Sequence, residues 1–359
     1  MNQKTTQILL NTSVALLKFA NKTQQKRGLS SFYDVRPKTK LQSYWEQIKV
    51  WTGAFVGATT VCGGLGYVIY SSKTSDANPR PIVSAFVHEK TQQALNEHFD
   101  YQGKNVALNP NEFQKFPLAK VIPLNHNTSI YRFALPEGKS LGLPTASCVV
   151  TKGPLDSNGK PIIRPYTPIT PGQQTTYFDL LVKTYPQGNM SKFIQNLKVG
   201  ETLEVKGPIK KIEYSPNMKK KIGMIAGGTG LTPMLQIIQE VLSNPVDKTE
   251  LTLLFANVAE EDILLKHNLD DLAQKFPNFK VHYVLETPPK GWNQSVGYVT
   301  DEVIKQKLPS PGSETLIMVC GPPPMMKAIS GEKAPDYTQG ELSGALKRLG
   351  YSPQEVFKF

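Results

Sequence analysis

The chain has 359 residues, of which 39% are hydrophobic and 19% are charged, and its formal net charge is +12. These fractions are typical of a globular protein, and the length is sufficient for two domains and an extension. The charge is concentrated at the amino end, because residues 1–49 carry nine Lys or Arg against Asp34 and Glu46. Residues 50–359 therefore contribute only +5 and carry no nucleic-acid-binding motif, which excludes a nucleic-acid partner.

Cysteine and histidine usage excludes further classes of protein. The three cysteines, Cys62, Cys148 and Cys320, fit neither a disulfide framework nor an iron–sulfur centre. The five histidines lack paired zinc spacing. No metal site is expected.

Residues 1–49 are predicted to be a basic mitochondrial targeting segment. Within residues 1–33 there are five Lys or Arg and no acidic residue, together with hydroxyl side chains and an apolar patch near Ile8 and Val14. The stretch Arg27–Ser31 is a hypothetical processing site. The alternative interpretation is a disordered basic tail.

Residues Val50–Tyr70 are predicted to be a transmembrane anchor. These 21 residues contain no charge, and aromatic residues lie near both ends. A buried core helix is the alternative, which five glycines make less favourable in water. Residues 71–111 are polar and show no regular apolar pattern, so they are interpreted as a linker.

Residues 112–214 are predicted to form an antiparallel β-barrel, since short apolar runs alternate with Gly, Pro and Asn. The runs are Ser129–Leu135, Ala146–Lys152, Tyr177–Lys183 and Glu201–Lys206. Residues 215–359 change to a strand–helix rhythm, which predicts a parallel α/β domain. Its expected elements are strands at Lys221–Ala226, Leu251–Ala256, Lys280–Leu285 and Thr315–Cys320, and helices at Thr232–Leu242 and Glu261–Lys275.

The stretch Arg164-Pro165-Tyr166-Thr167-Pro168 cannot curl into a helix, so it is expected to be a stiff strand edge. A guanidinium fork suits pyrophosphate, a phenol ring suits an isoalloxazine face, and a threonine hydroxyl suits a ribityl chain. The pattern indicates a flavin nucleotide. The alternative is an ordinary edge strand with a surface arginine and a half-buried tyrosine.

Two further motifs follow strands of the second domain. Gly227–Gly230 lies where the first strand becomes a helix, so its amides can face a pyrophosphate, although a plain turn would look the same. Cys320-Gly321-Pro322-Pro323 ends another strand, where α/β sheets place ligands. Glu286 also follows a strand, and a carboxylate there binds an adenosine ribose and repels a 2′-phosphate, which favours NADH over NADPH.

The order of Arg164–Thr167, Lys206–Pro208, Gly223–Pro233, Cys320–Met325 and terminal Phe359 resembles the NADH-cytochrome b5 reductases of the ferredoxin-NADP reductase superfamily. The resemblance covers roughly residues 110 to 359. The stretches Ser330–Lys333, Gln339–Leu342 and Val356–Phe359 look like the fungal mitochondrial branch.

The resemblance implies FAD and NADH as cofactors, and it implies site residues. Thr128 would lie near the reactive nitrogen of the flavin, Lys183 near the nicotinamide nucleotide, and the Cys320 thiol beside the carbon that gives up hydride, without acting as a nucleophile. Strand-surface side chains and a buried structural cysteine are the alternatives. The cofactor-binding residues would be Arg164, Pro165, Tyr166, Thr167, Leu181, Lys183, Tyr185, Gly188, Met190, Ser191, Gly228, Thr229, Thr232, Glu286, Cys320, Gly321, Pro322 and Phe359. Asn189 stands where the family has a lysine, so it is not assigned.

The implied activity is a membrane-anchored reductase that passes hydride from NADH to FAD and then single electrons to cytochrome b5 or a similar haem protein. Lys210, Lys211 and Lys219–Lys221 are candidate docking lysines for an acidic partner. A desaturase or oxygenase acceptor, or a non-catalytic membrane tether, are the alternatives. The expected location is mitochondrial, at the outer membrane or in the intermembrane space. The oligomeric state stays open.

Overall fold

The structure is a computed structural model, and it describes residues 105–359. The targeting segment, the Val50–Tyr70 anchor and most of the linker that the sequence predicts lie outside the described residues. Among residues 105–359, no helix combines the length and the apolar character that a bilayer crossing requires. Two β-sheets organise this part of the chain, one antiparallel and one parallel.

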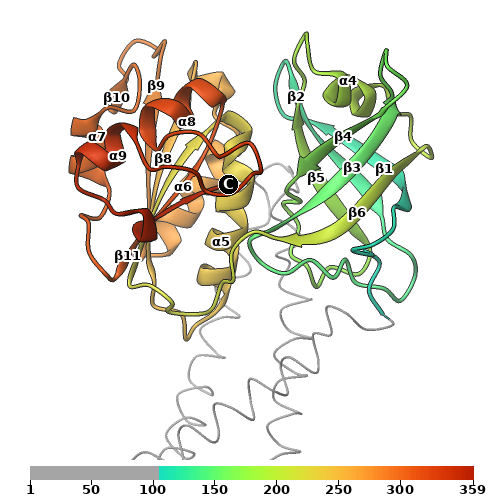
Figure 1. Cartoon of the computed structure of the whole chain (residues 1–359), viewed down its shortest axis with the longest axis horizontal. Helices are drawn as coiled ribbons and strands as arrows, with labels where there is room; N and C mark the ends of the chain where they lie inside the picture. Colours follow the sequence, from blue (N-terminus) through green and yellow to red (C-terminus); the bar gives the residue numbers. More distant parts are fainter. Residues whose placement is uncertain (1–104) are drawn as a thin grey trace, which may run out of the picture. The chain divides into compact units, whose positions relative to one another are not determined.

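The first sheet has six antiparallel strands in the order β4-β3-β6-β1-β2-β5 (Figure 1). This confirms the antiparallel sheet of the predicted β-barrel. Within residues 105–359, no ladder joins β4 to β5, so these two strands are the edges of the sheet. The bounds are β1 Gln114–Pro123, β2 Thr128–Ala134, β3 Ser147–Leu155, β4 Pro161–Tyr166, β5 Tyr177–Lys183 and β6 Thr202–Lys210, with helix α4 at Asn189–Asn196.

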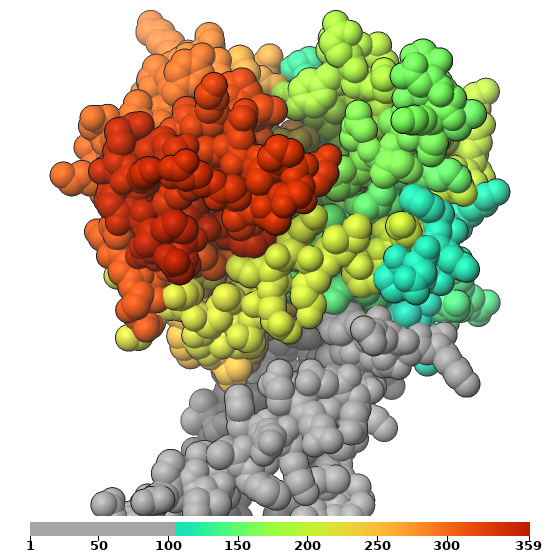
Figure 2. All heavy atoms as spheres, in the orientation of Figure 1, coloured from blue at the N-terminus to red at the C-terminus, as the bar shows by residue number. Residues whose placement is uncertain are grey.

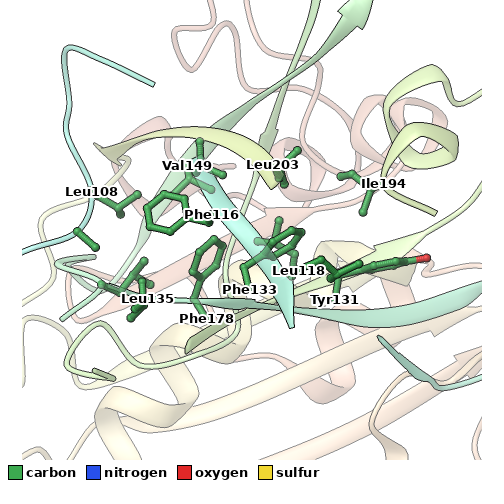
Figure 3. Close-up of a cluster of buried hydrophobic side chains, with 14 of the residues drawn as sticks. Leu108, Phe116, Leu118, Tyr131, Phe133, Leu135, Val149, Phe178, Ile194 and Leu203 are labelled. Atoms are coloured by element: carbon green, nitrogen blue, oxygen red, sulfur yellow. The ribbon is translucent and has the colours of Figure 1, made fainter. Parts of the chain in front are cut away.

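Aromatic rings fill the core of this domain (Figure 3). Phe178 meets Phe116 edge to face with 5.2 Å between ring centroids, and it stacks with Phe133 at 5.4 Å. All three side chains are buried. Since successive residues of a strand point to opposite faces, Phe116 and Leu118 of β1 reach the core while Lys115 does not.

The second sheet is parallel, in the order β10-β9-β8-β7-β11-β12. This confirms the predicted α/β domain. Its strands are β7 Lys221–Gly227, β8 Glu250–Asn257, β9 Phe279–Leu285, β10 Ser295–Val296, β11 Thr315–Cys320 and β12 Val356–Lys358. Its helices are α5 Leu231–Ser243, α6 Lys266–Lys275, α7 Asp301–Lys307, α8 Pro323–Ile329 and α9 Gly344–Arg348, with short 3-10 turns η2 Gly228–Gly230, η3 Glu260–Asp262 and η4 Pro353–Glu355.

Helices α7, α8 and α9 share one apolar cluster with β7 and β11. Ile304, Met326 and Leu346 of these helices are buried against Ile225 and Ile317 of the strands. The carboxyl-terminal part of the chain, in orange to red, makes up much of the second domain's surface in Figure 2. Both strands are buried almost throughout, as expected for a parallel sheet covered by helices.

One predicted element differs from the structure. The helix expected over Glu261–Lys275 begins only at Lys266, after the separate turn η3. Leu265 lies in the left-handed region with φ of 55°, and Ile263 is extended, so a continuous helix is interrupted between them. The apolar residues at Ile263 and Leu264 are buried by this loop rather than by a helical face.

Candidate active site

The stretch Arg164–Pro168 runs along the β4 edge of the first sheet and continues beyond it, as its prolines predict. The Arg164 guanidinium is exposed, and its Nη1 donates to the carbonyl of Ile163 at 2.7 Å. The Tyr166 ring is half-buried, and burial raises the pKa of its hydroxyl to about 12, against a smaller opposing effect of Arg164. A guanidinium with free N–H groups beside a flat ring fits FAD.

The opposite edge strand, β5, carries the second group of predicted residues. Thr128 of β2 pairs directly with Lys183 of β5, so the two predicted catalytic residues are neighbours. Thr128 is not a strand-surface hydroxyl, because it is 2% exposed and donates to Asn127 Oδ1 at 2.9 Å. Leu181 is buried, whereas Tyr185, just beyond the strand, is exposed.

Lys183 has a partner that the sequence did not indicate. Its Nζ lies 3.2 Å from Oδ1 of Asp262, a buried residue of η3 in the second domain. The other Asp262 oxygen accepts from the backbone N–H of Ala259 at 3.2 Å. Beside this pair, Asn125 donates to the carbonyl of Glu261 at 3.1 Å. Lys183 is therefore not an outward lysine, since it links β5 to the second domain.

The predicted phosphate site lies at the start of α4. Gly188 precedes the helix, and the Ser191 hydroxyl donates to the Gly188 carbonyl at 3.0 Å. A side chain on Gly188 would overlap the Ser191 hydroxyl, which would have to turn away from the Gly188 carbonyl. The Met190 side chain is buried in the domain core and leaves only its backbone for a ligand, while Asn189 is exposed at the first helical position.

In the second domain, the glycine turn joins β7 to α5 as predicted, through η2. Gly228 has φ of +54°, and no atom lies within 4 Å of the place that its side chain would take. The Thr232 hydroxyl donates to the carbonyl of Thr229 at 3.2 Å, which fixes the first turn of α5. Open backbone at the start of a helix suits the pyrophosphate of a dinucleotide.

The Cys320 loop packs directly against that turn. Cys320 pairs with Ala226 at the end of β7, and a Cβ on Gly230 would overlap the Cys320 carbonyl oxygen. On the other side of β11, the backbone N–H of terminal Phe359 donates to the carbonyl of Val319 at 3.0 Å. The glycine turn, Cys320–Pro322 and Phe359 therefore meet at the carboxyl edge of the parallel sheet.

The Cys320 thiol is expected to remain neutral during turnover. Burial raises the pKa of this thiol to about 12, and nearby Lys333 opposes the shift only partly. The rate at which NADH reduces the enzyme should therefore show no thiol ionisation between about pH 6 and about pH 10. Stopped-flow pH profiles of the wild type and of Cys320→Ser check this. An inflection near about pH 8.5 that disappears in the variant would contradict it.

Glu286 follows β9 at the same carboxyl edge, with an exposed side chain and its backbone N–H donating to the carbonyl of Asn257 at 3.2 Å. Asn257 ends β8, between the glycine turn and Glu286 in the strand order. Its side chain is 8% exposed, and Nδ2 has no hydrogen-bond partner among the described residues. A buried, unpaired amide at this edge fits a polar group of a dinucleotide. Asn257 was missed, although it is the polar end of an apolar strand.

The candidate docking lysines divide between two places. Lys210 closes β6 and pairs with Glu213 at 3.2 Å. Lys219 contacts the carbonyl of Ser313, and Lys220 lies 3.7 Å from Glu314. These two directly precede β7, about 23–26 Å from the glycine turn at about 3.3 Å per residue. The strand that the sequence predicted at Lys221–Ala226 therefore separates these two lysines from the glycine turn.

Comparison with known proteins agrees with this geometry. The chain matches the oxidoreductase FAD-binding domain over residues 115–214 and the oxidoreductase NAD-binding domain over residues 224–331. It is 49% identical over 269 residues to an NADH-cytochrome b5 reductase-like protein of Arabidopsis thaliana, covering 74% of this chain and 82% of the relative. It is 49% identical over 261 residues to NADH-cytochrome b5 reductase 1 of Dictyostelium discoideum, covering 72% and 86%.

Among solved structures, the cytochrome b5 reductase domain of Ulva prolifera nitrate reductase matches with a TM-score of 0.62 and 34% identity. The match covers 71% of this chain and 99% of that domain. The two domains of the ferredoxin reductase fold, one for FAD and one for NAD, are therefore both present in this chain.

Proposed function

Because this chain belongs to the NADH-cytochrome b5 reductase family, we propose that it passes electrons from NADH, through FAD, to cytochrome b5 or a similar small haem protein. Bound FAD would supply the chemistry that joins a two-electron donor to a one-electron acceptor. The observation that supports this role is the link between Lys183 of the flavin domain and Asp262 of the nucleotide domain.

The chain's own residues would bind and orient the two cofactors. Arg164 and the start of α4 would hold the FAD phosphates, and the Tyr166 ring would lie against the flavin. Gly228 and Thr229 would receive the NADH pyrophosphate, and Glu286 its adenosine ribose. The Cys320 loop would shape the place of the nicotinamide. No side chain is required to act as a nucleophile.

The acceptor is tested with the full-length protein. We expect the purified protein to be yellow, to bleach when NADH is added without oxygen, and to reduce purified cytochrome b5 rapidly in stopped flow. Bleaching by NADH with no transfer to cytochrome b5 would overturn the proposed acceptor and favour a desaturase or oxygenase partner. A protein that does not bleach with NADH would overturn the reductase function itself.

We also propose that residues 1–49 direct the chain to mitochondria and that Val50–Tyr70 anchors it in a membrane, at the outer membrane or facing the intermembrane space. The basic, acid-poor start and the uncharged stretch support this. A fluorescent protein fused after residue 104 should co-purify with mitochondrial membranes and resist carbonate extraction. A fusion without residues 50–70 should be released by carbonate, and a cytosolic full fusion would refute the targeting proposal.

Glu286 is expected to select NADH over NADPH. Its exposed carboxylate at the end of β9 would bind a ribose hydroxyl and repel a 2′-phosphate. Glu286→Arg should raise kcat/KM for NADPH by about tenfold or more, which corresponds to at least about 1.4 kcal/mol, and Glu286→Ala should raise it less. Steady-state kinetics with both nucleotides measure the change. An unchanged preference in both variants would refute the assignment.

A further inference from the structure

Gln236 is a buried residue of α5 whose side chain ties three segments of the chain together. Its Nε2 donates to the carbonyl of Pro168 at 2.9 Å, and its Oε1 accepts from the backbone N–H of Ser147 at 3.2 Å. The side chain is 7% exposed. Pro168 ends the flavin stretch just beyond β4 and Ser147 begins β3, so one carboxamide joins the nucleotide domain to two separate segments of the flavin domain.

One turn further along α5, a second side chain contacts the same part of the flavin domain. Glu240 accepts a hydrogen bond from the Thr145 hydroxyl at 2.8 Å. Residues four apart lie on the same helix face, so Gln236 and Glu240 form one line of contacts. Residues 145–147 of the flavin domain face this line of contacts. Between them, Ala146 adopts a left-handed backbone with φ of 58°, and its carbonyl accepts from the N–H of Lys211. The seam between α5 and residues 145–147 is thus held at several points.

The elements joined at this seam are the ones that carry the two cofactor sites. Helix α5 begins immediately after the Gly228–Gly230 turn, and Gln236 lies about 7.5 Å along it at about 1.5 Å per residue. Pro168 lies two residues beyond Tyr166. Only a few residues therefore separate Gln236 from the glycine turn and Pro168 from Tyr166. A shift at Gln236 would therefore move the nucleotide turn relative to the flavin strand.

We propose that Gln236 is a positioning residue for hydride transfer, which sets the separation between the nicotinamide and the flavin. This inference rests on the proposed reductase function. Gln236 bonds only to protein backbone, so it acts through Pro168 and through α5. Because reacting atoms must lie about 3–3.5 Å apart, a misplacement of about 1 Å can cost about a hundredfold in rate.

The residue type is matched to its two partners. The carboxamide of Gln236 carries an acceptor oxygen for the Ser147 N–H and a donor nitrogen for the Pro168 carbonyl on one planar group. Gln236→Glu keeps the shape and the acceptor but places a carboxylate oxygen against the Pro168 carbonyl. Gln236→Met keeps the length and removes both bonds. Gln239→Met, three residues further along α5, is the matched control, because the Gln239 side chain makes no hydrogen bond within the described residues.

Three measurements on the FAD-loaded, full-length protein test the proposal. Hydrogen–deuterium exchange reports on the Ser147 amide, stopped flow reports the reduction of the enzyme by NADH, and the re-oxidation of dithionite-reduced enzyme by ferricyanide reports a step that needs no nucleotide. In Gln236→Met we expect faster exchange at Ser147 and reduction by NADH slowed by about tenfold to a hundredfold. Re-oxidation should stay within about twofold of the wild type and of Gln239→Met.

The three measurements distinguish a wrong proposal about Gln236 from a wrong proposed function. Faster exchange at Ser147 with an unchanged rate of reduction would overturn the proposal, and an equal loss in both half-reactions would show a merely structural role. If Gln236→Met loses FAD, Gln236→Glu decides, because it retains the Ser147 bond and should slow only the reduction by NADH. A wild-type protein that NADH cannot reduce would instead refute the proposed function.

Discussion

Gly230→Ala is expected to slow the reduction of the enzyme by NADH by about a hundredfold and to lower the free energy of unfolding by about 1–3 kcal/mol. The backbone at Gly230 is helical, with φ of −60°, so alanine is not strained there. The cost is steric, because the new Cβ would overlap the carbonyl oxygen of Cys320. The glycine turn and the Cys320 loop must then separate.

This separation affects both sides of the nucleotide site at once. Gly227 also lies close to this loop, because a Cβ there would lie 2.7 Å from the Met325 sulfur and 2.9 Å from Pro322 Cδ. Because α8 begins at Pro323, directly after this loop, a shift of the loop should also displace the start of α8. Displacing Cys320 from the start of α5 changes the distance over which hydride must move, while the flavin domain, which makes none of these contacts, should keep its FAD.

Two other glycines serve as comparisons for Gly230→Ala. Gly312 has open space around it and no positive φ, so Gly312→Ala should leave stability and rate unchanged. Gly228→Ala meets no atom but adopts a left-handed backbone, so it should cost about 1–2 kcal/mol and weaken NADH binding. Stopped-flow reduction, NAD titration and urea unfolding measure these effects. If Gly230→Ala reduced at the wild-type rate, the tight packing would have no functional consequence.

Local signals in the sequence were sufficient to predict most of the fold. The strand predicted at Tyr177–Lys183 is β5 with the same bounds, because the β-favouring residues Tyr177, Phe178 and Val182 act within the segment itself, and every residue from Phe178 to Val182 is buried. The Arg164–Pro168 edge was predictable because proline restricts its own φ and the residue before it. The helix boundary at Lys266 was not, since the left-handed Leu265 is imposed by the packing of its neighbours.

The candidate site also contains features that the sequence predicted and contacts that it did not. The glycine turn, Cys320 loop and terminal Phe359 follow strands, and parallel strands bring their carboxyl ends to one edge. The contacts that were missed depend on distant partners. Gln236 reaches a carbonyl 68 residues away in the sequence, and Lys183 reaches a carboxylate 79 residues away. No periodicity or motif encodes such pairs, so the contacts between the two domains could only come from the structure.

Arg132→Met is expected to cause the largest loss of stability in the flavin domain, about 3–5 kcal/mol. Arg132 and Asp179 face each other across β2 and β5, and two guanidinium N–H groups donate to the two carboxylate oxygens at 2.8 Å each. Asp179 is fully buried. Its backbone also accepts from the N–H of Ile169 and donates to the Thr170 hydroxyl, which holds the chain just after Pro168. Removing the arginine leaves a buried charge without its partner.

The pH dependence distinguishes this cause from a simple loss of packing. Burial raises the pKa of Asp179, and the Arg132 fork opposes the shift, so removing Arg132 should raise the pKa further. A folded state that holds the proton more tightly than the unfolded state loses stability as pH rises, from the unfolded pKa near about 3.9 up to the raised folded value. The deficit of Arg132→Met should therefore be smallest at acid pH and largest at neutral pH. Urea unfolding across this range measures it.

The double variant Arg132→Met with Asp179→Leu should recover most of the lost stability, because it removes the unpaired charge and fills the space with apolar atoms. It should also lose the pH dependence. If the double variant were as unstable as Arg132→Met at every pH, the loss would come instead from the stacking of Arg132 on the Tyr177 ring, whose centroid lies 3.6 Å from the guanidinium carbon. Comparing the single and double variants thus shows whether the Arg132–Asp179 ion pair or the contact of Arg132 with the Tyr177 ring stabilises the pairing of β2 with β5, the strand that also carries Lys183.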